Sequence, residues 1–137
     1  MFRHACRAAL SVALAATALA VPPTASAQTA ISDAPDVFIS EYVEGSSFNK
    51  AVELFNATGA PVDLAAANYT LEIYNNGASA PTVESSLSGV IADRDVIVIA
   101  NSGATFPFDD TAGAVNFNGD DALVLRRDGA VIDSFGQ

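Results

Sequence analysis

Short apolar and aromatic runs, each closed by turn-forming residues, fill this chain from Val37 onward. The runs are rich in β-branched and aromatic residues and are bounded by glycine, proline, asparagine or aspartate, which is typical of strands in a sandwich or barrel. No long window has helical periodicity, and Leu64–Ala67 is at most a single turn. The sequence predicts an all-β domain with these eight strands: Val37–Val43, Ala51–Asn56, Tyr69–Tyr74, Thr82–Leu87, Asp95–Ala100, Ala114–Phe117, Ala122–Arg127 and Ala130–Phe135.

Turn dipeptides and one apolar run indicate how these strands connect. Asp128–Gly129 lies between two apolar runs, and a two-residue hairpin turn with positive φ at both central positions suits this dipeptide. Asn118–Gly119 and Asn76–Gly77 offer the same turn chemistry, although the second begins a longer loop. Val96–Ile99 is continuously apolar, which favours a central strand covered on both faces.

The first 27 residues have the three parts of a secretion signal. Arg3 and Arg7 form a positive start, Ala8–Val21 is apolar, and Ala25–Ala27 is a small-residue cleavage site. The apolar stretch is shorter than the roughly 20 residues that span a bilayer, so a retained membrane anchor is the weaker interpretation.

Cleavage after Ala27 would leave 110 of the 137 residues, enough for one domain with its own core. We expect a signal peptide over residues 1–27, a flexible segment over residues 28–36 and one β-sandwich domain over residues 37–137. The product would be secreted, into the periplasm or the extracellular medium, with no membrane span after cleavage.

Composition excludes several functions of the exported domain. His4 and Cys6 both lie in the leader, so a Ser–His–Asp triad, a Cys–His pair and an ordinary zinc site cannot form in the rest of the chain. After the leader the chain has four basic and sixteen acidic residues, which gives a net charge of −12. Direct nucleic-acid binding needs a basic surface, so we expect none, whereas basic protein surfaces and divalent cations are suitable partners.

The densest polar constellation joins the first two predicted strands. Under strict alternation Glu41 shares a face with Ile39 and Val43, so its carboxylate needs a partner. Lys50 is the nearest base, and we expect a partly buried Glu41–Lys50 or Glu53–Lys50 pair that fixes the intervening loop. The alternative is contact with an ion or ligand. The candidate structural or ligand-binding residues are Glu41, Glu44, Asn49, Lys50 and Glu53.

Phe48, in the loop of that constellation, has two interpretations. It is either an exposed aromatic for docking or a side chain that folds back over one end of the sandwich. Folding back is the more common arrangement for a single apolar residue in a polar loop.

Two acidic doublets lie further along the chain. Hard cations such as Ca²⁺ take several oxygens from carboxylates, amides and carbonyls, which acidic loops of exported proteins can supply. Neither doublet has the spacing of an EF-hand, and solvated turn carboxylates and strand caps are the more common arrangement. The candidate metal ligands are Asp109, Asp110, Asn118, Asp120 and Asp121.

The chain contains five segments in a characteristic order: Ile39–Asn56, Thr58–Leu64, Tyr69–Tyr74, Asn116–Leu125 and Gly129–Gln137. Together they resemble the lamin tail domain as found in secreted bacterial proteins. The similarity covers about residues 37–137, and its motifs occur in the order of the family. Phe48 and the connection Ala65–Asn68 depart from the usual pattern of the family's loops.

This resemblance implies an immunoglobulin-like β-sandwich with no catalytic residues of its own. It also implies a context, because such bacterial modules accompany endonuclease/exonuclease/phosphatase-type domains in exported nucleases, or occur on other surface and secreted proteins. We therefore expect a non-catalytic module for protein interaction, anchoring or spacing, whose partner is a protein or a cell-surface component. Two alternatives stay open: the chain is a fragment of an extracellular metal-dependent nuclease or phosphatase, or it is a calcium-stabilised adhesion or matrix module.

Overall fold

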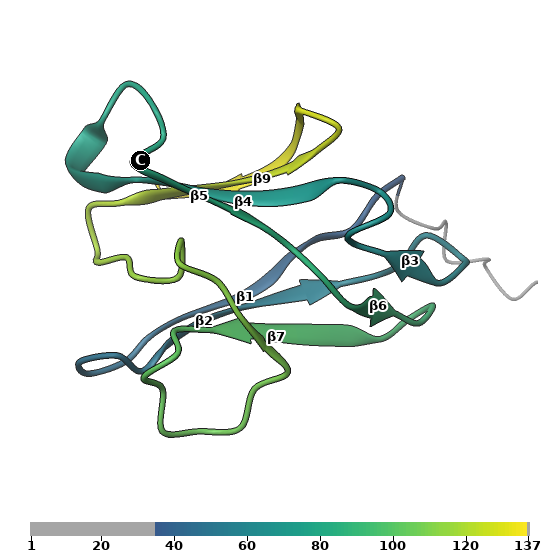
Figure 1. The fold of residues 1–137 in the computed structure, drawn as a ribbon, viewed down its shortest axis with the longest axis horizontal. Helices are drawn as coiled ribbons and strands as arrows, with labels where there is room; N and C mark the ends of the chain where they lie inside the picture. Colours follow the sequence, from purple (N-terminus) through teal and green to yellow (C-terminus); the bar gives the residue numbers. More distant parts are fainter. Residues whose placement is uncertain (1–34, 137) are drawn as a thin grey trace, which may run out of the picture. The chain divides into compact units, whose positions relative to one another are not determined.

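Two β-sheets pack face to face in the computed structural model, which describes residues 35–136 (Figure 1). The predicted signal peptide and most of the segment 28–36 lie outside the described residues. Between residues 35 and 136, no helix is long and apolar enough to cross a membrane. The elements are β1 (Phe38–Glu44), β2 (Lys50–Phe55), β3 (Val62–Asp63), β4 (Tyr69–Tyr74), the 3₁₀ turn η1 (Asn75–Gly77), β5 (Val83–Ser86), β6 (Val90–Ile91), β7 (Val96–Ala100), β8 (Asp110–Thr111), β9 (Ala122–Arg127) and β10 (Ala130–Phe135).

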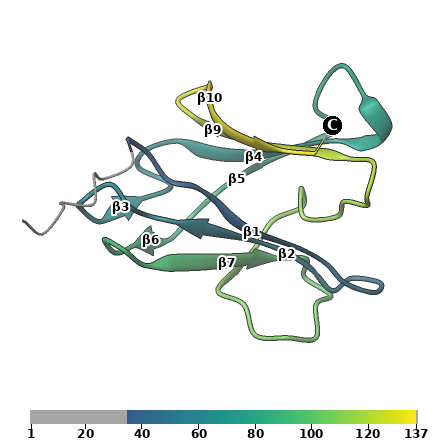
Figure 2. The ribbon, with the colours of Figure 1, turned by 180° about the vertical axis from the view of Figure 1, so that it is seen from behind.

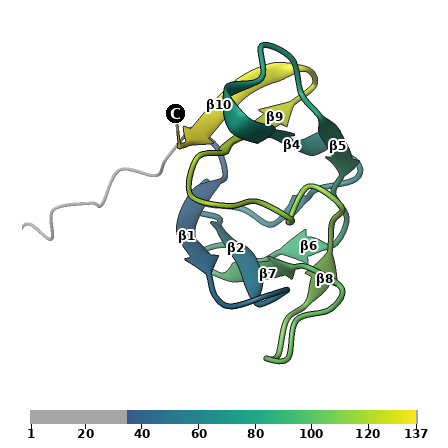
Figure 3. The same ribbon diagram turned by 90° about the vertical axis from the view of Figure 1, so that its left-hand side faces the viewer.

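The strands form two four-stranded layers and one short pair. The first sheet has the order β1-β2-β7-β8, the second has the order β10-β9-β4-β5, and β3 pairs with β6 at one end. Every pair is antiparallel except β7 with β8. Figure 2 shows the layers from behind, and Figure 3 shows them end on with the two sheets one above the other. The predicted all-β sandwich is therefore confirmed.

The core lies between the sheets, where alternate side chains of each strand point inward. Leu71, Ile73, Leu123 and Leu125 of the second sheet are buried, and so are the facing aliphatic side chains of β2 and β7. Each fully buried side chain of this size stabilises the fold by about 1.5–3 kcal/mol relative to exposure. The other large members of the core are Val37, Val52, Leu54, Leu64, Tyr69, Leu87, Ile91, Ile97, Ile99, Val115 and Phe117.

Seven of the predicted strands are present within one residue at either end, but Ala114–Phe117 is not a strand. Ala114 and Val115 are both fully buried although they are neighbours, so this segment fills the space between the sheets instead of alternating. Its backbone bonds to side chains: the Ala114 amide donates to Ser85 Oγ at 3.0 Å, and Asn101 Nδ2 donates to the Val115 carbonyl at 2.9 Å. Its apolar and aromatic residues between turn-forming residues had made this run look like a strand.

Three short strands were not predicted, namely β3, β6 and β8. Each has two residues, which is too short for an alternating pattern to be recognised. The prediction for Val96–Ile99 is only partly correct. This run lies inside the first sheet, between β2 and β8, but only Ile97 and Ile99 are buried, whereas Val96 is exposed and Val98 is half-buried.

The turn dipeptides behave differently from one another. Asp128 and Gly129 have φ values of 48° and 78°, which confirms the predicted hairpin turn between β9 and β10. Asn76 and Gly77 also have positive φ and begin the longer loop, as predicted. Asn118–Gly119 forms a turn closed by the Asp121 amide on the Asn118 carbonyl at 3.0 Å, but neither of its φ values is positive.

A β-bulge in β1 changes which side chains face the core. Ile39 lies opposite Leu54 and Glu41 lies opposite Glu53, so Ser40 is an extra residue between the two pairs. Glu41 therefore points outward with Glu53, and Tyr42 points inward. The prediction that Glu41 shares a face with Ile39 and Val43 is correct for Val43 and wrong for Ile39, which packs against the core, because strict alternation does not continue through a bulge.

The strands β1 and β10 lie side by side and join the two sheets along one edge (Figure 3). The Ile39 amide donates to Asp133 Oδ2 at 2.8 Å. Further along, the Tyr42 ring stacks on Phe135 with the ring centroids 4.4 Å apart. These two contacts follow the same direction in both strands, so β1 and β10 run parallel.

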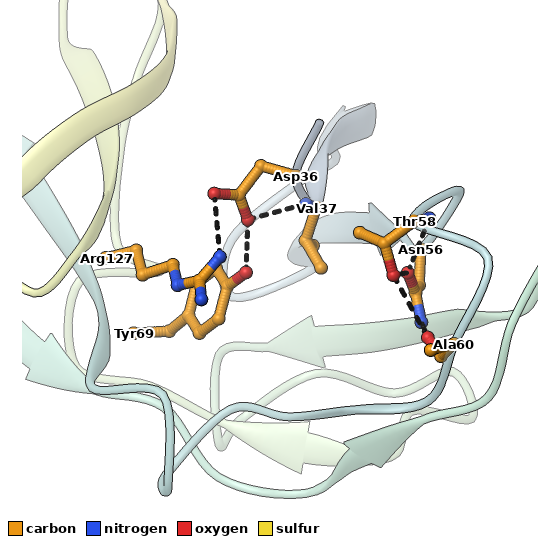
Figure 4. A network of polar contacts seen from close by, with 7 residues as sticks. All are labelled: Asp36, Val37, Asn56, Thr58, Ala60, Tyr69 and Arg127. Carbon is orange, nitrogen blue, oxygen red and sulfur yellow. Dashed lines mark hydrogen bonds and ion pairs between the residues drawn. The ribbon is translucent and has the colours of Figure 1, made fainter. Parts of the chain in front are cut away.

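Asp36 fastens the beginning of β1 to the second sheet (Figure 4). Its carboxylate accepts hydrogen bonds from the Tyr69 hydroxyl and from the Val37 amide, and it pairs with Arg127 Nη1 at 3.3 Å. Burial and then the bond to Asp36 raise the pKa of Tyr69 to about 12. The same carboxylate raises the pKa of Arg127.

Candidate binding face on the first sheet

The outer face of the first sheet is mostly apolar, and it is covered at Ala51 and Ala100, which are buried. Three rows of residues cross β1, β2 and β7 in register: Phe38, Phe55 and Val96; Glu41, Glu53 and Val98; Val43, Ala51 and Ala100. Outer faces of sandwich sheets ordinarily carry polar side chains at these positions. Here Glu41 and Glu53 are the only charged residues in the three rows.

A shallow pocket of about 220 Å³ lies on this face. Val43, which is 40% exposed, Ala51 and Val98 form apolar walls, and Phe106 reaches over them from the loop between β7 and β8. Small-molecule sites have volumes of about 300–1,000 Å³. The pocket is therefore the size for a single side chain of a partner. We call the surface formed by Val43, Ala51, Val98, Phe106, Glu41 and Glu53 the apolar face.

The two carboxylates of the apolar face differ in their contacts. Glu53 Oε1 accepts a hydrogen bond from Ser40 Oγ at 2.7 Å, so the bulge residue holds this side chain in place. Glu41 is exposed, and its carboxylate makes no hydrogen bond or ion pair with any residue between 35 and 136. The two carboxylates lie directly opposite each other in register, where like charges are destabilising.

Lys50 lies on the other side of β2 and pairs with Glu44, with 3.8 Å between Nζ and Oε1. The predicted Glu41–Lys50 and Glu53–Lys50 pairs do not form, because Glu44 is the residue opposite Lys50 across the hairpin. The Lys50 ammonium also lies 5.8 Å from the centre of the Phe117 ring, an arrangement favoured by cation–π attraction. Both contacts are with side chains of the same domain.

Tyr42 occupies the inward position that the bulge creates. Its ring lies between Phe117 and Phe135, at centroid distances of 4.3 and 4.4 Å, and its hydroxyl donates to Glu44 Oε2 at 3.1 Å. Burial, the hydrogen bond to Glu44 and the negative charges of Glu44 and Asp121 all raise the pKa of Tyr42. Glu44 therefore orients both Tyr42 and Lys50.

Asn49 and Phe48 connect the β1–β2 loop to the loop that follows β7. Asn49 Oδ1 accepts hydrogen bonds from the Thr105 amide at 2.8 Å and the Thr105 hydroxyl at 2.9 Å. Phe48 packs so closely on Gly103 that a Cβ added there would lie 3.0 Å from the Phe48 ring. Phe48 therefore rests on this neighbouring loop with 56% of its surface exposed, so the expectation that it covers one end of the core is wrong.

Three of the five candidate metal ligands, namely Asp109, Asp110 and Asp121, accept hydrogen bonds from backbone amides. Asp109 Oδ2 accepts from the Val98 amide at 2.8 Å, and Asp110 Oδ1 accepts from the Thr111 amide at 2.8 Å. Asp121 is buried and accepts from the amides of Asn76 and Asn118, both at 2.8 Å. Asp120 is exposed. Over the described range, no three acidic, histidine or cysteine side chains come together in a way that could hold a metal ion.

The outer face of the second sheet carries a wider hollow of about 560 Å³, but its main polar groups are already paired. Arg126 Nε donates to Glu72 Oε1 at 2.8 Å, and the Tyr74 hydroxyl donates to Glu72 Oε2 at 2.8 Å. Arg126 Nη1 donates to the Gly129 carbonyl at 2.9 Å. The bond to Glu72 is also the main cause of the raised pKa of Arg126. This network stabilises the sheet and leaves the apolar face as the better binding candidate.

Sequence reasoning identified Glu41 and Glu53 but missed the apolar residues around them. Val43 and Ala51 belong to strands that the pattern did predict, and alternation already put Val43 on the face of Glu41, but the bulge turns both of them to the side opposite Ile39. Phe106 comes from the loop that follows β7. The path of this loop depends on the hydrogen bond between Thr105 and Asn49, which lies 56 residues earlier in the chain. The β-branched content of β7 was the one signal that pointed to this face.

Comparison with protein families gives one finding that agrees with this architecture. The family model described as Lamin Tail Domain matches residues 30–137, which is most of the chain and includes every described strand. A comparison with curated proteins gives no match.

Proposed function

Since the chain belongs to the lamin tail domain family, we propose that it is an exported, non-catalytic module that docks a partner protein on its apolar face. The observation that carries this proposal is the combination of exposed Val43, half-buried Val98 and the exposed, unpaired Glu41 around one pocket. Contiguous exposed apolar patches rimmed by polar residues mark interaction sites. The sequence after the leader also lacks the histidine and cysteine that common nucleophile–base pairs require.

Export and the nature of the partner are part of this proposal. The leader-like first 27 residues support secretion to the periplasm or the extracellular medium. The surplus of acidic residues favours a protein or cell-surface component over nucleic acid, because phosphates would be repelled. We further propose that the module is an accessory to an exported nuclease, the setting that the family resemblance implies for bacterial relatives.

The positions of the two ends of the domain support a spacing role in addition to docking. Asp36 contacts Arg127, at the last residue of β9, whereas Gly136 lies against Asp121 and Ala122, at the first residues of that strand. The domain therefore begins and finishes at opposite ends of the second sheet (Figure 1). Anything joined to residues 36 and 136 would therefore be held apart by the length of this sheet.

Site-specific photo-cross-linking tests the docking role. A photoreactive amino acid replaces Val43 on the apolar face, and in a matched protein it replaces Val131, which is exposed on β10 of the other sheet. Each protein is irradiated with proteins from the surface and medium of the source cells, and cross-linked partners are identified by mass spectrometry.

We expect a defined partner to be cross-linked through position 43 and not through position 131. The same set of cross-links from both positions, or none from position 43, would contradict docking on the apolar face. Both positions are exposed, so the substitutions should leave the melting temperature nearly unchanged, and a thermal melt of each protein checks this.

A further inference from the structure

Negative charge on the apolar face has no balancing cation on that face. Glu41 and Glu53 face each other across β1 and β2, and the neighbouring base, Lys50, points to the opposite side of the sheet toward Glu44. Ser40 satisfies one oxygen of Glu53, and nothing in the described range satisfies Glu41. A cation supplied from outside would relieve the repulsion between these two carboxylates.

The shape of the pocket restricts that cation. Its walls are the hydrocarbon side chains of Val43, Ala51, Val98 and Phe106, and its volume is about 220 Å³. A metal ion or a small inorganic cation would gain nothing from apolar walls. Lysine and arginine side chains, in contrast, pack their methylene stems on apolar surface while the charged end reaches polar groups.

The charge of the whole chain acts in the same direction. Sixteen acidic and six basic residues give a net charge of −10. Such a surface attracts basic protein partners over several ångströms and accelerates their association at low salt. Charge complementarity thus favours a basic segment of a protein over an acidic or purely apolar one.

We infer that the apolar face binds a lysine or arginine side chain of the partner protein, presented between apolar residues, with its stem on Val98 and its charged group between Glu41 and Glu53. This inference rests on the proposed docking role and names the chemistry of the partner. In an extended partner segment, the flanking apolar side chains would cover Val43 and Phe106.

Two capped tripeptides, Leu-Lys-Leu and Leu-norleucine-Leu, test this inference. Norleucine keeps the methylene stem of lysine and removes the charge. Each peptide is titrated into the isotope-labelled full chain while the backbone amide resonances are followed by NMR. The proteins are the wild type, Glu41→Gln, and the control Glu84→Gln, which removes an exposed carboxylate from the second sheet.

We expect the lysine peptide to shift the resonances of Val43, Ala51 and Val98 and to bind about tenfold more tightly than the norleucine peptide. Glu41→Gln should remove most of this difference, and Glu84→Gln should preserve it. Added salt should also reduce the difference, because one of the two carboxylates is exposed.

Other outcomes separate this inference from the docking role. Equal binding of both peptides on the apolar face would overturn the inference about charge and leave the docking role intact. Lysine-peptide shifts centred on another surface, or an unchanged preference for lysine in Glu41→Gln, would also overturn it. Absence of binding by either peptide would overturn it as well, and the cross-links through position 43 would then decide the docking role independently.

Discussion

At the scale of single residues, Asn56 holds together three segments at one end of the sandwich (Figure 4). Its Nδ2 donates to the carbonyls of Ala60 at 2.8 Å and Ile91 at 2.9 Å, and its Oδ1 accepts from the Thr58 amide and hydroxyl. The side chain is fully buried. The sequence placed Asn56 at the end of a strand, but it gave no sign of Ile91, which lies 35 residues away.

Replacement of Asn56 should be costly because the buried groups that it satisfies would lose their partners. We expect Asn56→Ala to lower the free energy of unfolding by about 2–4 kcal/mol. The control is Asn116→Ala, an exposed asparagine whose loss should change stability by less than about 0.5 kcal/mol. Urea unfolding of both variants measures the difference, and equal stabilities would contradict this role for Asn56.

The raised pKa of Tyr69 predicts that the domain loses stability in alkaline solution. Burial and then the hydrogen bond to Asp36 raise its pKa from 10.0 to about 12, so the folded chain keeps a proton that the unfolded chain releases. The free energy of unfolding should be unaffected below about pH 10 and should fall as the pH rises from about 10 to about 12. Tyr42, whose pKa is also raised, adds an effect of the same sign.

Urea unfolding at a series of alkaline pH values measures this dependence. The variant Tyr69→Phe keeps the titrating hydroxyl of Tyr42 but has lost that of Tyr69. Its free energy of unfolding should therefore fall less steeply with pH than that of the wild type. The variant should also lose about 1 kcal/mol at neutral pH, because the bond to Asp36 is gone. An unchanged pH dependence would mean that the proton of Tyr69 is not held more tightly in the folded state.

At the scale of elements, the hairpins were predictable and the bulge was not. Asp128–Gly129 specifies its turn through local backbone preferences, which the sequence states directly. The bulge at Ser40 depends on contacts of β1 with β2 and β10. One of them is the hydrogen bond that the Ser40 hydroxyl donates to the Glu53 carboxylate. Alternation therefore grouped Glu41 with Ile39 as well as with Val43, and the binding pocket could not be assembled from the sequence.

The turn between β9 and β10 offers a test of backbone strain alone. Gly129 has a φ of 78° and no atom within 4 Å of the position that a Cβ would take. Gly129→Ala should therefore destabilise the domain by about 1–2 kcal/mol without any steric clash. Gly113→Ala is the matched control, because its Cβ would make only ordinary contacts, at 3.6 and 3.7 Å, and its φ lies outside the left-handed range.

Thermal or urea unfolding of the two glycine variants gives the comparison. Gly113→Ala should be neutral or slightly stabilising, since alanine restricts the unfolded chain more than glycine does. Equal destabilisation of both variants would point to a general intolerance of side chains, and no loss in Gly129→Ala would mean that the turn adopts another conformation.

At the scale of the whole molecule, the sandwich follows from the number and spacing of apolar runs, and this much the sequence predicted. The long-range closure of the two sheets was not predictable. It depends on β1 meeting β10, and on Ala114–Phe117 filling the space between the layers as an irregular segment. Both features join residues that are far apart in the chain, and no local pattern encodes such pairings.

The parallel course of β1 and β10 has a mechanical consequence. A pulling force applied at Asp36 and Gly136 would slide these strands past each other in shear, so the Ile39–Asp133 bond and the Tyr42–Phe135 stack would resist together before either separates. In single-molecule stretching, Asp133→Ala should lower the rupture force more than Asp93→Ala, whose bond to Gly59 lies in a loop. A sandwich that is tied in this way can transmit tension between whatever it connects.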